Sequence, residues 1–287
     1  MQITVMGYTF GEGHDDFELT DVEMGLGEVR SSDLTWPLRG GTRPGVSYLE
    51  AGSITLSAVT PFGINDESAA DSALGRFLSS WRKALAAGPG VLLPMTVTTP
   101  AKTRVVYGRP DRIDLPEPGS TSMEQGIAEL TALFKVHDPL VYSSSPVILS
   151  LSVVPKSLGG IVAPIVTPVK TTLTSGVEYR QLVVPGDAPA PLKVTFHGPA
   201  KDPVVTVAGT TIGISGSILY DEEVIVNGRD RTVTYSDGRQ AASKLTRKSR
   251  IDKFTAEPGT HEVSFTATDR TGTARITVEA TPAYYHI

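Results

Sequence analysis

The sequence predicts a mainly β protein of two domains, with one long α-helix in the first domain and an antiparallel β-sandwich as the second. The chain has 287 residues, roughly the length of two typical domains. Its 28 glycines and 21 prolines disfavour a helical bundle. Short runs of alternating or β-branched residues recur between turn residues, which is typical of strands.

The first half combines one helical segment with strand-like runs. Apolar residues recur at spacings of three and four from Ala70 to Leu85 and form a stripe along one side of a helix that Gly88 ends. We interpret Phe77 and Trp81 as core residues rather than the lining of a cofactor slot. Strands with period-two or β-branched patterns are predicted at 53–60, 91–99, 103–109 and 126–138.

A change in composition separates two domains. Residues 1–145 form the predicted N-terminal domain, and residues 146–176 are rich in Pro, Gly and Ser, as expected for an inter-domain arm. In residues 177–287, dipeptides such as Asn227-Gly228 and Asp237-Gly238 separate short strands and accept the backbone angles of tight hairpins. This pattern predicts a jelly-roll or lectin-like sandwich.

Composition and motifs exclude several classes of function. The absence of cysteine excludes disulfides, thiolate metal sites and cysteine nucleophiles. Neither nucleotide-binding glycine motif is present, no GxSxG occurs, and no second histidine is spaced to complete a metal site with His14-Asp15-Asp16. We therefore expect no enzyme, and no catalytic, metal or cofactor-binding residue. No signal peptide or membrane span is apparent, so we expect a soluble protein that does not insert into membranes.

Charge is unevenly distributed in a chain of net charge −5. Residues 1–35 carry eight acidic side chains against Arg30, which we interpret as a solvated loop. Residues 228–253 carry eight basic and three acidic side chains; a solvated face, docking on an acidic neighbour and nucleic-acid binding all remain open. Charged loops are the best candidates for docking, and these contain Asp15, Asp16, Arg39, Arg43, Arg247 and Arg250.

Several stretches together resemble the distal tail proteins of long-tailed phages, often described as minor tail proteins. In the first half these are MQITVMGYTF, EVRSSDLTWPLRGGTRPGVSYLEAGSITLSAV, RVVYGRPDRIDLP and LTALFKVHDPLVYS. In the second half they are VVPGDAPAPLKVTFHGP and FTAEPGTHEVSF. The chain departs from the family at Pro185, where many relatives have Asn, and at 226–228, where they often have Asp.

The resemblance implies a structural protein of the virion, made in the host cytoplasm and placed at the distal end of the tail. Its N-terminal domain would form a ring, commonly a hexamer, and its C-terminal domain would be a galectin-like sandwich projecting outward. The implied partners are further copies of the chain, the tail tube protein, the tape measure protein and a baseplate hub or tail-tip protein. DNA would pass through the ring without specific binding. We expect part of the acidic segment 1–35 to line that channel, because negative charge repels phosphate, and the basic segment to face outward.

Two other functions remain open. A two-domain carbohydrate-binding protein could stack host-surface glycans on exposed aromatic rings, for which Tyr220, Tyr235, Tyr284 and Tyr285 are candidates. Buried or strand-pairing tyrosines are the more ordinary interpretation. A hydrolase of host wall polymers would need an acid/base pair of carboxyl groups, and no such pair is evident.

Overall fold

A computed structural model describes residues 1–11, 17–25, 27, 29–60, 67–116, 127–153, 155–156, 174–175, 178–269 and 272–287. The chain divides into two compact units. The first comprises residues 1–144 and 285–287, and the second comprises residues 145–284.

The first unit consists of strands and one helix. In chain order these are β1 (Gln2–Val5), β2 (Tyr8–Gly11), β3 (Glu18–Gly25), β4 (Val29–Ser31), β5 (Leu34–Thr35), β6 (Thr42–Arg43), β7 (Ser47–Leu49), β8 (Gly52–Val59), α1 (Glu67–Leu85), β9 (Leu93–Thr98), β10 (Thr103–Asp114), β11 (Glu129–Val136) and β12 (Val141–Ser143).

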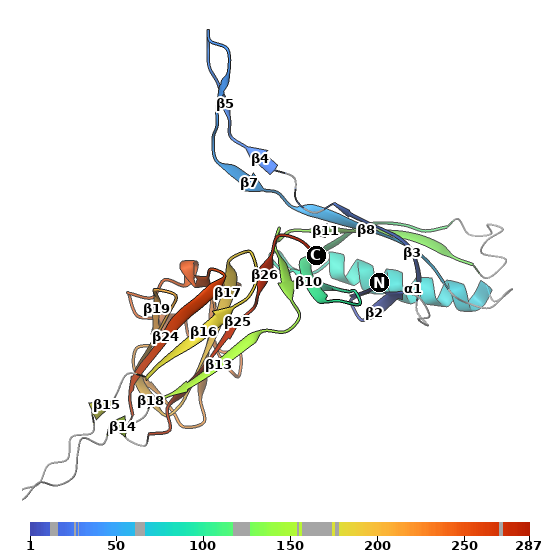
Figure 1. The fold of residues 1–287 in the computed structure, drawn as a ribbon. Helices are drawn as coiled ribbons and strands as arrows, with labels where there is room; N and C mark the ends of the chain where they lie inside the picture. The colour runs from blue at the N-terminus through green and yellow to red at the C-terminus, as the bar shows by residue number, and fades with distance from the viewer. Residues whose placement is uncertain are drawn as a thin grey trace, which may run out of the picture. The chain divides into compact units, whose positions relative to one another are not determined.

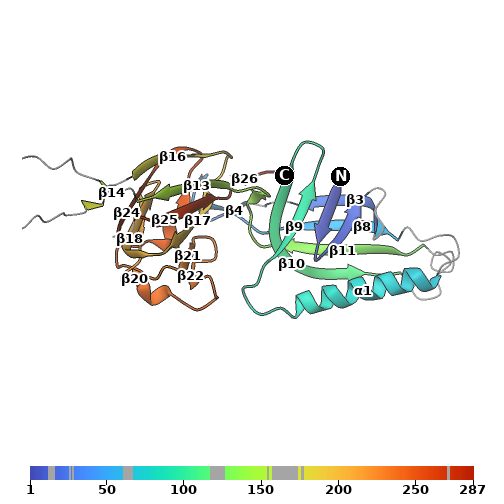
Figure 2. The same ribbon diagram turned by 90° about the horizontal axis from the view of Figure 1, so that it is seen from below.

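A large antiparallel sheet forms the body of this unit, with strand order β2-β1-β9-β10-β11-β8-β3 and with β12 paired to β10. Met6 and Gly7 both have positive φ angles of 52° and 84°, so β1 and β2 are joined by the tight turn that hairpin twist favours. Helix α1 covers one face of the sheet (Figures 1 and 2). The strands β4 to β7 lie outside the sheet and form two short antiparallel pairs.

The core of the first unit lies between α1 and the sheet. Phe10, Phe17 and Phe77 pack with ring centroids 5.0–5.6 Å apart, and Trp81 lies 5.4 Å from Phe77. The indole nitrogen of Trp81 donates a hydrogen bond to the backbone oxygen of Asp111 at 3.1 Å, which satisfies its only polar atom. The predicted helix and the interpretation of Phe77 and Trp81 as core residues are confirmed.

The second unit is built from strands and two short 3₁₀ helices. These are β13 (Val147–Ser152), β14 (Pro155–Lys156), β15 (Thr174–Ser175), β16 (Glu178–Val184), β17 (Ala190–His197), β18 (Ala200–Val207), β19 (Thr210–Gly213), β20 (Ser217–Ile218), β21 (Glu223–Asn227), β22 (Thr232–Tyr235), η1 (Ala242–Lys244), η2 (Ile251–Lys253), β23 (Thr255–Ala256), β24 (Gly259–Thr268), β25 (Arg275–Ala280) and β26 (Ala283–Tyr284).

Two antiparallel sheets of this unit share one hydrophobic core. Their orders are β13-β25-β17-β21-β22, with β23 paired to β17, and β16-β24-β18-β19, with β20 paired to β18. Phe196 and Ile276 come from the first sheet, and Val205 and Phe265 from the second; all four are fully buried in the same cluster. The mainly β fold with one long helix, and the strands predicted in the second half, are confirmed.

Two expectations about local structure are wrong. Strand β13 pairs along its whole length with β25, so residues 147–152 belong to a sheet of the second unit and not to an arm; residues 157–173 lie outside the described residues. The acidic segment is not one solvated loop, because residues 18–25 form β3, an edge strand paired with β8. At an edge, outward-facing carboxylates are compatible with strand pairing and discourage aggregation.

Candidate assembly surfaces

A two-stranded arm, residues 29–49, extends from the sheet of the first unit (Figure 1). Val29 to Ser31 pair with Ser47 to Leu49, and Leu34 and Thr35 pair with Arg43 and Thr42. Every residue from 29 to 49 is exposed. The arm is therefore held by backbone pairing and polar contacts rather than by a core of its own.

The middle of the arm is fastened by the side chains of Ser32 and Asp33. The Ser32 backbone nitrogen donates to Val46 O at 3.1 Å, and Ser32 Oγ accepts from Val46 N at 3.1 Å. Asp33 Oδ1 accepts from the backbone N–H of Gly45 at 2.8 Å, and its Oδ2 accepts from Ser31 Oγ at 3.0 Å. The Gly45 N–H, and then the Ser31 hydroxyl, lower the pKa of Asp33 below its ordinary value. These contacts fix the path of the two strands of the arm where the strand pairing is interrupted.

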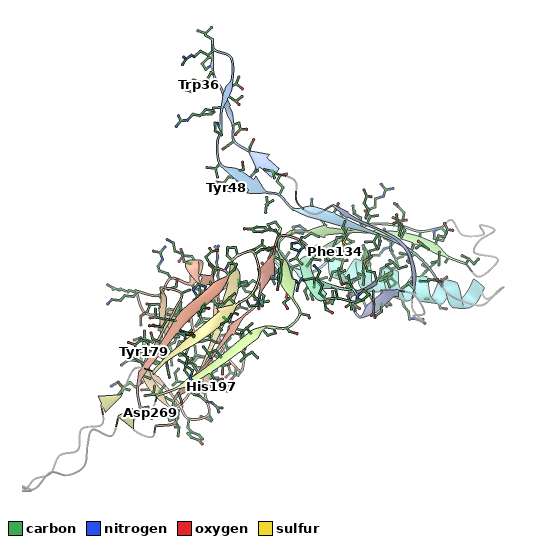
Figure 3. The ribbon with its side chains drawn as sticks, in the orientation of Figure 1. Trp36, Tyr48, Phe134, Tyr179, His197 and Asp269 are labelled. Atoms are coloured by element: carbon green, nitrogen blue, oxygen red, sulfur yellow. The ribbon has the colours of Figure 1, made fainter. Side chains whose placement is uncertain are left out.

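Large apolar side chains are exposed along the arm, and Trp36 and Tyr48 are labelled in Figure 3. The side chain of Trp36 is 45% exposed, and Leu38 at the tip is fully exposed. The complete set is Val29, Leu34, Trp36, Leu38, Val46, Tyr48 and Leu49. Large apolar side chains exposed together are a candidate interaction surface. Sequence reasoning missed this surface, although the apolar residues within a Gly-rich polar segment were its signal.

Carboxylates gather on the face of the large sheet opposite the buried side chains of β8. The register places Val59 between Glu18 and Glu129, Asp21 beside Ser57, and Glu23 beside Thr55. The alternate residues of β8 (Ile54, Leu56 and Ala58) are buried on the other face. Among the described residues of β3, β8 and β11, Lys135 is the one basic side chain on this acidic face.

The basic segment of the second unit contains a rigid turn, residues 246–249. The Ser249 backbone nitrogen donates to Thr246 O at 3.0 Å, Thr246 N donates to Gly213 O at 2.9 Å, and Gly213 N donates to Ser249 Oγ at 2.9 Å. Arg247 and Lys248 are exposed between these anchors and have no ion-pair partner among the described residues. The turn thus presents two adjacent positive charges to solvent.

The predicted docking residues fall on different units. Arg39 and Arg43 lie on the arm, and Arg247 and Arg250 lie in the second unit. Arg250 is paired with Asp252 at 2.9 Å. Asp15 and Asp16 lie outside the described residues. The structure therefore brings the predicted residues together only as two separate pairs.

One polar constellation resembles catalytic geometry. His197 Nδ1 lies 2.8 Å from Glu223 Oε1, and His197 Nε2 lies 3.0 Å from Thr277 Oγ1. A hydroxyl, an imidazole and a carboxylate in this order could activate a nucleophile. However, all three residues lie within paired strands β17, β21 and β25, where the ladder uses the backbone N–H groups that an oxyanion hole would need. We interpret the trio as a cross-strand polar cluster.

The part of the chain that the structure describes contains no group of three or more His, Asp or Glu side chains placed to hold a metal ion. Its helices include none with the length and hydrophobicity needed to span a lipid bilayer. A cavity of about 470 Å³ lies at the root of the arm, lined by Met24, Gly25 and Gly27, by residues 51–53, and by residues of the neighbouring strands β10 and β11.

Known structures share this arrangement of elements over nearly the whole chain. The crystal structure of SPP1 Dit (gp 19.1), described as a paradigm of the hub adsorption apparatus in phages infecting Gram-positive bacteria, matches with a TM-score of 0.63 at 13% identity and covers 98% of both chains. This chain and SPP1 Dit therefore share one fold. Two structures of the phage p2 baseplate in its activated conformation, with Ca and with Sr, also match.

The match to the Ca form has a TM-score of 0.54 at 11% identity and covers 91% of this chain and 90% of that chain. The match to the Sr form has a TM-score of 0.59 at 10% identity and covers 98% and 96%. No protein-family model matches the sequence, and no curated protein matches it either.

Proposed function

We propose that this chain is a non-enzymatic distal tail protein of a phage, which assembles with copies of itself into a ring at the end of the tail tube. The ring would join the tube to the baseplate or tail tip and let DNA pass. Residues 1–144 would form the ring, and the second unit would be a galectin-like domain. The fold shared with SPP1 Dit over 98% of both chains supports this proposal.

The observation that carries the proposal is the exposed arm. Seven large apolar residues from Val29 to Leu49 are between 41% and fully exposed within the described part of the chain. Burying such side chains contributes about 1.5–3 kcal/mol each, so a second protein surface that covers the arm gains a large free energy. An identical neighbour is the simplest source of that surface, because every copy supplies both an arm and a receptor for one.

Such a contact is heterologous, since the arm of one copy meets a different surface on the next. Heterologous contacts either close into a ring or continue as a filament. The cavity at the root of the arm is a candidate receptor for the arm of a neighbour. A closed ring buries all arms and leaves no copy with a free arm, which fits a hub of defined size.

The acidic face of the large sheet is proposed to line the channel. Glu18, Asp21, Glu23 and Glu129 share that face with Lys135. Negative charge along a channel wall repels the phosphates of the duplex, so DNA would slide without sticking.

Self-assembly is tested by light scattering and native mass spectrometry of the full chain. The wild type is expected to form one closed oligomer. The triple variant Leu34→Ser, Trp36→Ser, Leu38→Ser should be monomeric, because it removes the apolar surface at the tip of the arm. Val183→Ser, which changes an exposed apolar residue of β16, should assemble normally. A wild type that stays monomeric at every concentration would contradict the proposal.

The channel assignment is tested by retention of the assembled protein on immobilised duplex DNA across a salt series. Glu18→Gln, Asp21→Asn, Glu23→Gln together should create salt-sensitive retention that the wild type lacks. The control variant removes the same charge from exposed positions of the second unit, with the substitutions Asp221→Asn, Glu257→Gln and Glu262→Gln. It should not be retained on the DNA. Equal retention of the two variants would show that only net charge matters and would reject the assignment of the acidic face to the channel wall.

A further inference from the structure

The second unit contains a groove of about 360 Å³ at one end of the sheet β16-β24-β18-β19. Three segments line it: residues 199–201 at the start of β18, residues 217–220 in and after β20, and residues 268–269 at the end of β24. Its volume lies at the lower end of the range for small-molecule sites, about 300–1,000 Å³. The groove is distinct from the arm and from the acidic face, which belong to the first unit.

An exposed aromatic ring stands at the rim of this groove. The side chain of Tyr220 is 79% exposed, and its neighbour Leu219 is 60% exposed. The turn that carries them is fixed, because Glu222 N donates to Leu219 O at 3.1 Å and Leu219 N donates to Glu222 Oε2 at 3.1 Å. Gly198 N also donates to Glu222 O at 3.1 Å and ties the turn to the end of β17. The ring of Tyr220 is therefore held in solvent by an ordered backbone.

Polar groups lie on the other walls. The carboxylate of Asp269 is buried, and its Oδ2 accepts hydrogen bonds from Thr273 N at 2.6 Å and Ala274 N at 2.8 Å. Lys201 lines the groove with an exposed side chain. One carboxylate and one ammonium leave the groove without net charge, and both are groups that hydrogen-bond hydroxyls.

We propose that this groove binds one pyranose ring of a glycan. A pyranose has an apolar C–H face, which packs on an aromatic ring such as Tyr220, and an edge of hydroxyls that both donate and accept. Asp269 would accept from those hydroxyls, and Lys201 would donate to them. A protein partner fits less well, because two adjacent apolar side chains fall far short of the roughly 800 Å² that a stable interface buries on each partner.

Saturation-transfer NMR on the full-length chain tests the proposal, with methyl β-glucopyranoside, methyl β-galactopyranoside and N-acetylglucosamine as probes. A site of this size should bind one of them with a dissociation constant of about 1 mM. Tyr220→Ala should weaken binding about tenfold or more, since stacking and contact area are both lost. Tyr220→Phe should retain it, because the ring face is unchanged. Lys201→Met should weaken sugar binding and leave the packing of the core unchanged.

Tyr179→Ala is the matched control, because Tyr179 on β16 is also an exposed tyrosine of the second unit, at 60%. It should leave binding unchanged, and circular dichroism should show all variants folded. Failure of all three probes to bind overturns the proposal, as does equal loss in Tyr179→Ala and Tyr220→Ala. If Tyr220→Ala changes the oligomeric state and leaves the binding of every sugar unchanged, the groove is a protein contact instead. The sugar-binding outcomes do not depend on whether the arm forms a ring.

Discussion

The two tryptophans of the chain lie in opposite environments of the same unit. Trp81 on α1 is fully buried and its indole nitrogen is hydrogen-bonded, whereas Trp36 on the arm is 45% exposed. The helix is therefore stabilised by its own chain, whereas the apolar side chains of the arm have no such cover. A large apolar residue in the first environment supports folding, and in the second environment it is available for assembly.

Replacing each tryptophan by alanine should give the largest contrast. Trp81→Ala leaves a cavity beside Phe77 and should lower the free energy of unfolding by about 3–5 kcal/mol. Trp36→Ala should change it by no more than about 0.5 kcal/mol. Urea denaturation followed by circular dichroism, on samples dilute enough to be monomeric, measures both. A large loss on Trp36→Ala would mean that the arm packs on its own chain.

The same contrast explains what the sequence could reveal. The stripe from Ala70 to Leu85 predicted α1 because one side of the helix packs against the sheet and the other faces solvent, and that difference produces the periodicity. The arm buries neither face, so its strands show no alternation, and no periodicity in the residues around Trp36 predicts them. In this chain the periodic pattern reports burial against the sheet of the same unit, and the arm, which has no such burial, carries no such pattern.

Two further errors have related causes. The carboxylates of β3 lie at a sheet edge where water solvates them, so an acidic composition was compatible with a strand although it suggested a loop. Residues 147–152 are flanked by prolines at 146 and 155, and the composition of the surrounding segment concealed the strand β13. The docking residues remain a prediction, since Arg39 and Arg43 were chosen for their charge, whereas the surface that we propose for assembly consists of the exposed apolar residues beside them.

A smaller effect on assembly is expected from changing one glycine of the arm, with a second glycine as its control. A Cβ atom on Gly45 would overlap the backbone oxygen of Ser32, whereas a Cβ atom on Gly40 would meet no atom within 4 Å. Gly45→Ala should therefore push the two strands of the arm apart and reduce the fraction of oligomer. The free energy of unfolding of the core should change little.

Gly40→Ala is the matched control and should assemble as the wild type does. Light scattering of both variants at equal concentration makes the measurement. Normal assembly of Gly45→Ala would mean that the geometry of the arm is not critical, and that its apolar side chains act without a defined shape.

The smallest effect should be a dependence of arm structure on acid. The Gly45 N–H and the Ser31 hydroxyl lower the pKa of Asp33 from its ordinary value of 3.8. A lowered pKa in the folded state means that the ionised form stabilises the arm above that value, and that this contribution fades as the pH falls through the lowered pKa. Exchange of the Gly45 amide hydrogen should accelerate when the pH falls from about 5 to about 3, relative to its intrinsic rate, while amides of α1 stay protected. Asp33→Asn should remove this pH dependence. If the dependence persists in that variant, the Asp33 carboxylate is not its source, and the middle of the arm is held without it.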